Sequence, residues 1–219
     1  EIMAGLGISK RSNVESPPSF IIPRRYFYEH IDPRVRNTVQ NTIDKLQGFG
    51  ANVSNRDILG IDYSPGIQAV TIASEASQAN EEILKNNPDA LADDVRLRLE
   101  AGHLYLATEY LKAQRLRRQV RTAAMNIMGE ESVFLVPAMP VLPPKINSST
   151  VMIDGKEMHV GSLLMRFTSP FNFCGFPALS MPCGVAENGL PVNIQIVGQP
   201  GSDLHVLQVA KWCEERLSL

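Results

Sequence analysis

The chain has few cysteines, no excess of charge of either sign and no long hydrophobic run. Its three cysteines, Cys174, Cys183 and Cys213, include no close-spaced pair, which fits neither a disulfide framework nor a zinc site. With 21 Lys and Arg against 23 Asp and Glu, no basic surplus attracts nucleic acid or anionic lipid. No stretch approaches the ~20 apolar residues of a membrane span, and no signal-peptide pattern begins the chain. We therefore expect a soluble, cytoplasmic protein with neither a nucleic-acid nor a membrane partner.

Motifs that carry chemistry are also scarce. The 15 glycines include no Gly-Gly pair, no Gly-x-Ser-x-Gly nucleophile elbow and no phosphate-binding Gly-x-x-x-x-Gly-Lys loop. The four histidines stand far apart, without the spacing that places two metal ligands on one helix face. Ser148-Ser149 lacks flanking glycines and a nearby lysine and is typical of a turn, and the cysteines are typical of small buried apolar residues. No residue of this chain is thus a candidate nucleophile or metal ligand.

The length and composition allow one or two domains with a sizeable core, since 44% of the 219 residues are hydrophobic. The chain begins at Glu1, without methionine, in an apolar run that resembles the interior of a longer sequence. We expect residues 1–19 to be a connector from a missing upstream part and residues 20–219 to form the domain.

Helical patterns dominate the first two thirds of the domain. Asp32-Pro33 offers an N-cap followed by Pro at the first helical position, and predicts a helix that ends near Gly48. A second helix is predicted from Ser64-Pro65 towards Leu84. A third is predicted over residues 92–128, where apolar residues recur with a near 3.6 period and the interspersed arginines are typical of a solvated face.

Strand patterns appear at five places and a last helix closes the chain. That helix is predicted to begin with Asp203 as its cap. Because strands and helices alternate, the fold class is α/β. The predicted strands cover residues 20–23, 51–53, 133–136, 178–182 and 192–197, and the last two form a hairpin through Glu187-Asn188-Gly189.

The most informative segment runs from Phe167 to Ala178 and reads FTSPFNFCGFPA. It is followed by LSMPCG at 179–184 and GLPVNIQIVG at 189–198. Gly175 and Gly184 permit backbone conformations or close approaches that a Cβ would block. Asn172 is expected to lock the loop through buried hydrogen bonds, with a substrate-facing role as the alternative. Gln195, in an apolar strand, requires a buried partner.

This segment resembles the C-terminal signature of the amidase-signature family. That signature runs Thr, Pro, Asn, two positions, Gly, one position, Pro-Ala, then a strand ending in Pro and Gly, then Gly-Leu-Pro and Gln-Ile-x-Gly, and every position is met here. The resemblance extends to roughly residues 20–219, and its implied fold is part of a mixed β-sheet covered by helices on both faces. Earlier matches are Ile22-Pro23, Asp32-Pro33-Arg34-Val35, Gly50-Ala51, Ser74-Glu75-Ala76, Arg98 to Gly102 and Val136-Pro137.

The resemblance implies an amidase that hydrolyses the C–N bond of a small amide. Enzymes of the family use a serine nucleophile, a second serine with a cis peptide bond and a lysine, all in the N-terminal half. This chain has no matching Gly/Ser-rich segment, so the triad lies outside it. No cofactor and no metal are implied. The implied partners are a small-molecule amide and the N-terminal half of the same protein, and a homodimer is left open.

The resemblance also suggests which residues form the wall of the substrate pocket. Thr168, Phe171 and Asn172 are the candidates in the signature segment. Arg98 matches a position that holds a substrate carboxylate in the amidotransferase subunits of the family, a task that suits the guanidinium fork. Those subunits also carry an acidic residue shortly before the signature, where this chain has Met165 and Arg166.

Three functions therefore stay open. The first is part of a small-amide hydrolase, which the missing acidic residue favours. The second is part of a subunit similar to those of glutamyl-tRNA amidotransferase, and the third is a non-catalytic scaffold chain. In the first two cases we expect the 219-residue chain alone to be inactive. We also expect it to aggregate, because apolar strands that belong to a larger sheet would be exposed.

Overall fold

The computed structural model describes residues 16–129 and 131–217, which form two compact units. One unit combines Glu1–Ile58 with Ala124–Leu219, and the other is Leu59–Ala123. The expected connector at residues 1–19 falls mostly outside the described residues.

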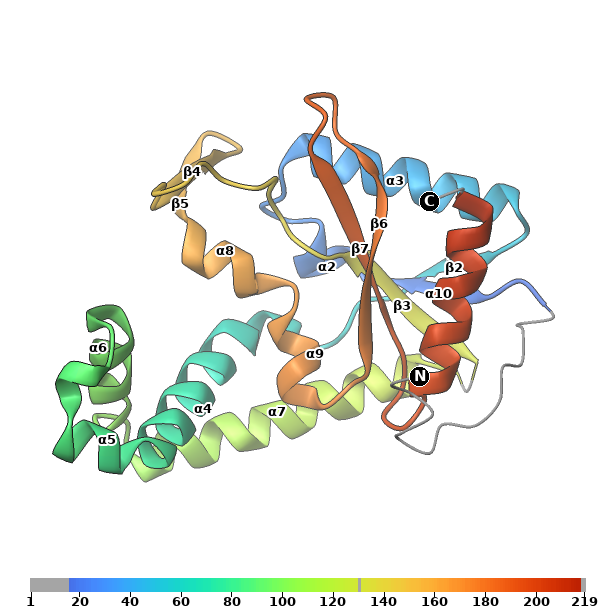
Figure 1. Ribbon diagram of the computed structural model, residues 1–219. Helices are drawn as coiled ribbons and strands as arrows, with labels where there is room; N and C mark the ends of the chain where they lie inside the picture. Colours follow the sequence, from blue (N-terminus) through green and yellow to red (C-terminus); the bar gives the residue numbers. More distant parts are fainter. Residues whose placement is uncertain (1–15, 130, 218–219) are drawn as a thin grey trace. The chain divides into compact units, whose positions relative to one another are not determined.

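A five-stranded mixed sheet forms the centre of the first unit (Figure 1). The strand order is β2-β1-β3-β7-β6. β1 pairs in parallel with β2 and β3, whereas β7 pairs antiparallel with β3 and β6. All five predicted strands and the predicted hairpin are confirmed. Their bounds are β1 Ser19–Ile22, β2 Asn52–Asn55, β3 Ser132–Pro137, β6 Ala178–Val185 and β7 Pro191–Val197.

Helices α3 (Pro33–Gly48) and α10 (Asp203–Leu217) pack on one face of the sheet, against β6, β7 and each other. Thr42, buried on α3, donates a hydrogen bond to the carbonyl oxygen of Cys183 on β6 at 2.9 Å. The side chain of Asp32 accepts a hydrogen bond from the backbone of Arg34, so the predicted cap of α3 is present. On α10 the buried side chains include Val209 and Trp212.

An aromatic cluster covers part of the opposite face. It joins α2 (Arg24–Phe27), β3 and α9 (Ser169–Cys174), and Figure 1 shows α9 and α10 on opposite sides of β6 and β7. The ring of Phe171 stacks on that of Phe27 at 5.4 Å and on that of Phe134 at 6.0 Å between centroids. The expected α/β fold, a mixed sheet with helices on both faces, is therefore confirmed.

A two-stranded hairpin stands apart from the main sheet. β4 (Thr150–Ile153) and β5 (Lys156–His159) pair antiparallel through Asp154 and Gly155, which both have positive φ, and α8 (Val160–Arg166) follows. The sequence carries the Asp-Gly signal of a tight hairpin turn here. These two strands were nevertheless not among the predicted ones.

The second unit is helical and departs from the predicted helix bounds at two points. The helix expected from Ser64 towards Leu84 is divided at Asn80 into α4 (Ser64–Ala79) and α5 (Glu81–Asn86). The single helix expected over residues 92–128 is wrong. It is two helices, α6 (Asp93–Gly102) and α7 (Ala107–Ile127), and α7 runs on into the first unit. Two 3-10 turns, η1 (Ile61–Tyr63) and η2 (Pro88–Ala90), complete the set.

Packing and capping explain the break between α6 and α7. A Cβ on Gly102 would collide with the carbonyl oxygen of Ala73 on α4, so α6 approaches α4 with its last residue. The chain then turns, and the carboxylate of Glu109 accepts a hydrogen bond from the backbone N–H of Leu106 at 2.9 Å. This bond satisfies an N–H that has no helical partner at the start of α7.

No helix among the described residues is long and apolar enough to span a membrane.

Candidate functional site

The signature segment folds into the short helix α9 between the end of α8 and the start of β6. Pro170 stands in its first turn, where a missing N–H costs nothing. Gly175 ends it with φ 70°, a conformation that disfavours any residue with a Cβ. The backbone N–H of Phe176 donates to the carbonyl oxygen of Phe171 at 3.0 Å and closes the last turn. The Asn-x-x-Gly spacing of the signature is thus the spacing of a helix end.

Phe171 anchors α9 from inside. Its side chain is only 2% exposed, and it lies between the rings of Phe27 and Phe134 with the edge of Phe176 at 6.5 Å between centroids. A ring packed in this way stabilises the helix and offers almost no surface to a ligand. Phe171 therefore supports the candidate wall from behind.

Thr168 and Asn172 lie one helical turn apart, where side chains share a face. The Thr168 hydroxyl is half-buried and donates to the carbonyl oxygen of Met165 at 3.4 Å. The side chain of Asn172 is exposed, and it has no hydrogen bond to any part of the chain that the structure describes. The expectation that Asn172 locks the loop through buried bonds is therefore wrong, because its amide faces outward from the helix. Its substrate-facing alternative stays a proposal.

Gln195 links the sheet to the start of the signature segment. Its side chain is 4% exposed, and its Nε2 donates to the carbonyl oxygen of Phe167 at 3.2 Å. Phe167 directly precedes Thr168, so the central strand β7 holds the beginning of the candidate wall. The predicted buried partner of Gln195 is confirmed.

Arg166 and Tyr26 hold each other just before the signature. The guanidinium of Arg166 lies 4.1 Å from the centre of the Tyr26 ring, and its Nη2 donates to the Tyr26 carbonyl oxygen at 3.2 Å. The Tyr26 hydroxyl donates in return to the Arg166 carbonyl oxygen at 3.1 Å. Tyr26 has φ 73°, which is uncommon for a residue with a large side chain. This pair was not predicted, and the sequence offers no signal for it.

Arg98 lies on α6, in the other compact unit from Thr168, Phe171 and Asn172. Its side chain is 75% exposed, and its Nη2 stands 3.8 Å from a carboxylate oxygen of Asp94. So loose and exposed a pair contributes little to stability. The guanidinium is therefore accessible to an anion.

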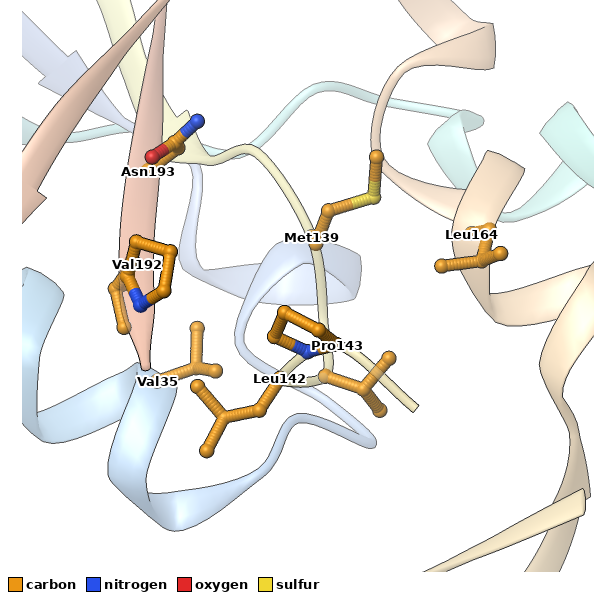
Figure 2. Close-up of a pocket in the computed structure, with 9 residues that line it drawn as sticks. Val35, Met139, Leu142, Pro143, Leu164, Val192 and Asn193 are labelled. Atoms are coloured by element: carbon orange, nitrogen blue, oxygen red, sulfur yellow. The ribbon is translucent and has the colours of Figure 1, made fainter. Parts of the chain in front are cut away.

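A largely apolar pocket of about 230 Å³ lies at the hairpin end of β7 (Figure 2). Among its described lining residues, Asn193 supplies the one side-chain amide and none is titratable. Such a pocket can hold an apolar group but cannot move a proton. It was not predicted from the sequence. The lining residues are Val35, Met139, Val141, Leu142, Pro143, Leu164, Pro191, Val192 and Asn193.

The cysteines do not supply a nucleophile. Burial raises the pKa of the Cys183 thiol to about 11 and that of Cys213 to about 12, so both stay protonated at neutral pH. All three cysteines are buried, and none forms a disulfide. Within residues 16–129 and 131–217, no three His, Cys, Asp or Glu side chains gather into a group that could hold a metal ion. The described residues thus offer walls for a substrate, without a group that attacks it.

Known proteins resemble this chain over most of its length. A family profile described as Amidase matches residues 8–207. An amidase of Pseudomonas putida is 29% identical over 207 residues, which cover 87% of this chain and 44% of the relative. One subunit of the glutamyl-tRNA(Gln) amidotransferase of Lachnospira eligens is also 29% identical, with 81% and 41% covered. The crystal structure of an amidase superposes with a TM-score of 0.87 at 24% identity, covering 94% of this chain and 47% of its own. The chain spans less than half of each.

Proposed function

Because this chain belongs to the Amidase family, we propose that it is the C-terminal portion of a longer, cytoplasmic amidase that hydrolyses the C–N bond of a small amide. The attacking serine, the second serine with its cis peptide bond and the lysine would lie upstream of residue 1. Two observations support this division. The chain spans 44% of the P. putida amidase, and its described residues hold walls and anchors without a nucleophile.

The upstream triad has a simple physical logic. A serine hydroxyl is a weak nucleophile at its ordinary pKa and needs a base. A lysine can be that base only when it is neutral, and removal from water lowers its pKa towards neutrality. A bridging serine hydroxyl would pass the proton from nucleophile to lysine and later to the leaving amine. No metal or cofactor takes part in this proposal.

The observation that carries the role of this chain is the outward-facing amide of Asn172. It has no partner among the described residues and shares a helix face with the Thr168 hydroxyl. One amide and one hydroxyl on a helix anchored by Phe171 can donate to a carbonyl oxygen and accept from an amide N–H of a substrate. We assign Thr168 and Asn172 to the substrate wall and Phe171 to its support.

Arg98 extends the proposal to anionic amides. Its exposed guanidinium suits a carboxylate, and its pairing with Asp94 at 3.8 Å is weak enough to exchange. Because Arg98 belongs to the other compact unit, its contact with the same substrate as Asn172 is a separate part of the proposal.

An amidotransferase role stays the second candidate, since the L. eligens amidotransferase chain matches this one at the same 29% identity. Against it stands Arg166, where such chains would have an acidic residue nearby. The bonds of Arg166 with Tyr26 engage the side chain within the protein itself. A non-catalytic scaffold is the third candidate.

One experiment separates the three candidates. The full-length protein would be purified and its ammonia release measured with neutral primary amides, and separately with glutamine, charged tRNA and partner subunits. We expect release from simple amides without tRNA. Activity only with charged tRNA would favour the amidotransferase. An upstream reading frame without a Ser/Lys core, together with no turnover, would favour the scaffold. The 219-residue chain serves as control and should be inactive.

A further inference from the structure

The outer strand β6 has a free edge in the part of the chain that the structure describes. β6 is last in the strand order β2-β1-β3-β7-β6, and β7 is its one hydrogen-bonded neighbour there. The backbone N–H of Gly198 donates to the carbonyl oxygen of Pro177 at 3.0 Å, so that carbonyl points towards β7. Because successive backbone groups of a strand point to opposite sides, those of Leu179 and Met181 also face β7.

The groups of Ala178 and Ser180 therefore point away from the sheet. A second bond fixes the same alternation independently. The backbone N–H of Ala138 donates to the carbonyl oxygen of Asn193 at 2.9 Å, which turns Asn193 towards β3 and its neighbour Ile194 towards β6. Ile194 is paired with Met181, in agreement with the first bond. Two N–H and two C=O groups thus form an outward row of the kind that pairs with a further strand.

The side chains along this edge do not protect it. Ala178, Ser180 and Pro182 are exposed, and β6 contains no charged residue from Ala178 to Val185. Free edges in natural sheets are usually short or carry charges, prolines or bulges. Pro182 and the bulge before Gly184 protect only the far end of β6. The opposite edge strand, β2, is by contrast short and polar.

We propose that the β6 edge over Ala178–Met181 is a docking surface where the remaining part of a longer protein adds one β-strand to this sheet. The occupant follows from length, since this chain covers 44% of the P. putida amidase and 47% of the superposed crystal structure. β6 directly follows α9 and Pro177, so the added strand lies next to the segment that carries Thr168 and Asn172. The inference rests on the proposed function and gives it a place where the two parts of the protein meet.

Residue-resolved hydrogen exchange in the full-length protein tests the edge without using activity. The amides of Leu179 and Met181 should be protected by β7. If a strand is added, those of Ala178 and Ser180 should also exchange at least about tenfold more slowly than unprotected amides. Protected Leu179 and Met181 beside unprotected Ala178 and Ser180 would overturn the proposal, whatever the enzyme does with amides.

Two variants identify what covers the edge. Ser180→Pro removes an outward N–H and leaves the bonds to β7 in place, as Pro182 already does, whereas Ser180→Ala keeps the N–H. We expect Ala178 to lose its protection in Ser180→Pro and to keep it in Ser180→Ala, with Met181 protected in both. Protection of Ala178 that survives Ser180→Pro, or that rises with protein concentration as in pairing of two copies, would overturn the proposal. If Ser180→Pro does not fold, the wild-type exchange pattern decides.

Discussion

The side-chain amide of Gln195 donates a hydrogen bond to the carbonyl oxygen of Phe167 at 3.2 Å and so ties the central strand β7 to the residue before Thr168. Both residues are buried. This bond is the direct connection between the Gln-Ile-x-Gly and Thr-x-Pro-x-Asn parts of the signature, which lie far apart in sequence. A change at Gln195 should therefore act on the candidate wall although Gln195 does not belong to it.

Gln195→Leu should lower the free energy of unfolding by about 1 to 3 kcal/mol, because it leaves the Phe167 carbonyl buried without a partner. Urea unfolding of the full-length protein measures this loss. The matched control is Gln119→Leu, the same change at an exposed position of α7, which should stay within about 0.5 kcal/mol of wild type. Equal effects of the two changes would show that the Phe167 bond contributes nothing.

Phe171 and Asn172 are neighbours with opposite roles. Phe171→Ala should cost about 3 to 5 kcal/mol of stability, because it empties the centre of the aromatic cluster. Asn172→Ala should change stability by no more than about 0.5 kcal/mol, since its side chain is exposed. Thermal melting together with amide turnover separates the two. A large loss of stability in Asn172→Ala would restore the locking role, and unchanged turnover would remove Asn172 from the substrate wall.

Arg98→Leu should raise KM for carboxylate-bearing amides by about tenfold, worth ~1.4 kcal/mol, and leave KM for neutral amides nearly unchanged. The reason is that its guanidinium is exposed and only loosely paired. Arg118→Leu removes another exposed cation of the same compact unit and controls for a general loss of positive charge. Equal changes of KM for both substrate classes would exclude Arg98 from the site.

The sequence predicted the features of the fold that depend on local patterns. Asp32-Pro33 predicted the start of α3, Glu187-Asn188-Gly189 predicted the hairpin, and a polar Gln195 in an apolar strand predicted a buried partner. Each of these requirements can be read within a few residues. The Asp154-Gly155 hairpin was equally local and was overlooked.

Features that depend on tertiary packing could not be predicted. The break after Gly102 depends on how closely α6 approaches Ala73, and the positive φ of Tyr26 depends on Arg166, which lies 140 positions away. The exposure of Asn172 depends on which face of α9 the aromatic cluster covers. An asparagine among aromatic residues gives no sign of this in sequence.

Gly102→Ala should destabilise the helical unit by about 1 to 3 kcal/mol, because the new Cβ would overlap the Ala73 carbonyl and the Ser77 hydroxyl. Ser77 cannot yield easily, since its hydroxyl bonds the carbonyl oxygens of Ala73 and Leu99. Gly66→Ala, in open space on α4, should be neutral or stabilising by up to ~1 kcal/mol. Thermal melting followed by circular dichroism measures both. A tolerated Gly102→Ala would mean that α4 and α6 can separate freely.

Asp32 makes stability depend on pH in a known direction. Its carboxylate caps α3 at the backbone N–H of Arg34 at 2.8 Å and pairs with the guanidinium of the same residue at 2.6 Å. The hydrogen bond from the Arg34 side chain holds the pKa of Asp32 below its usual value in the folded protein. A carboxyl with a lowered folded pKa stabilises the protein above its unfolded pKa of about 3.9, and this contribution is lost as pH falls through the folded pKa.

Asp32→Ala should therefore cost about 1 kcal/mol at pH 7, the usual loss for a removed cap. Asp32→Asn keeps a capping oxygen and loses only the charge, so its cost at pH 7 should be smaller. The stability difference between wild type and Asp32→Asn should shrink as pH falls below about 4, because the wild-type carboxyl then becomes neutral as well. Urea unfolding of the three proteins between pH 3 and 7 measures the differences. A wild-type advantage over Asp32→Asn that persists unchanged to pH 3 would show that shape, and not charge, carries the contribution of Asp32.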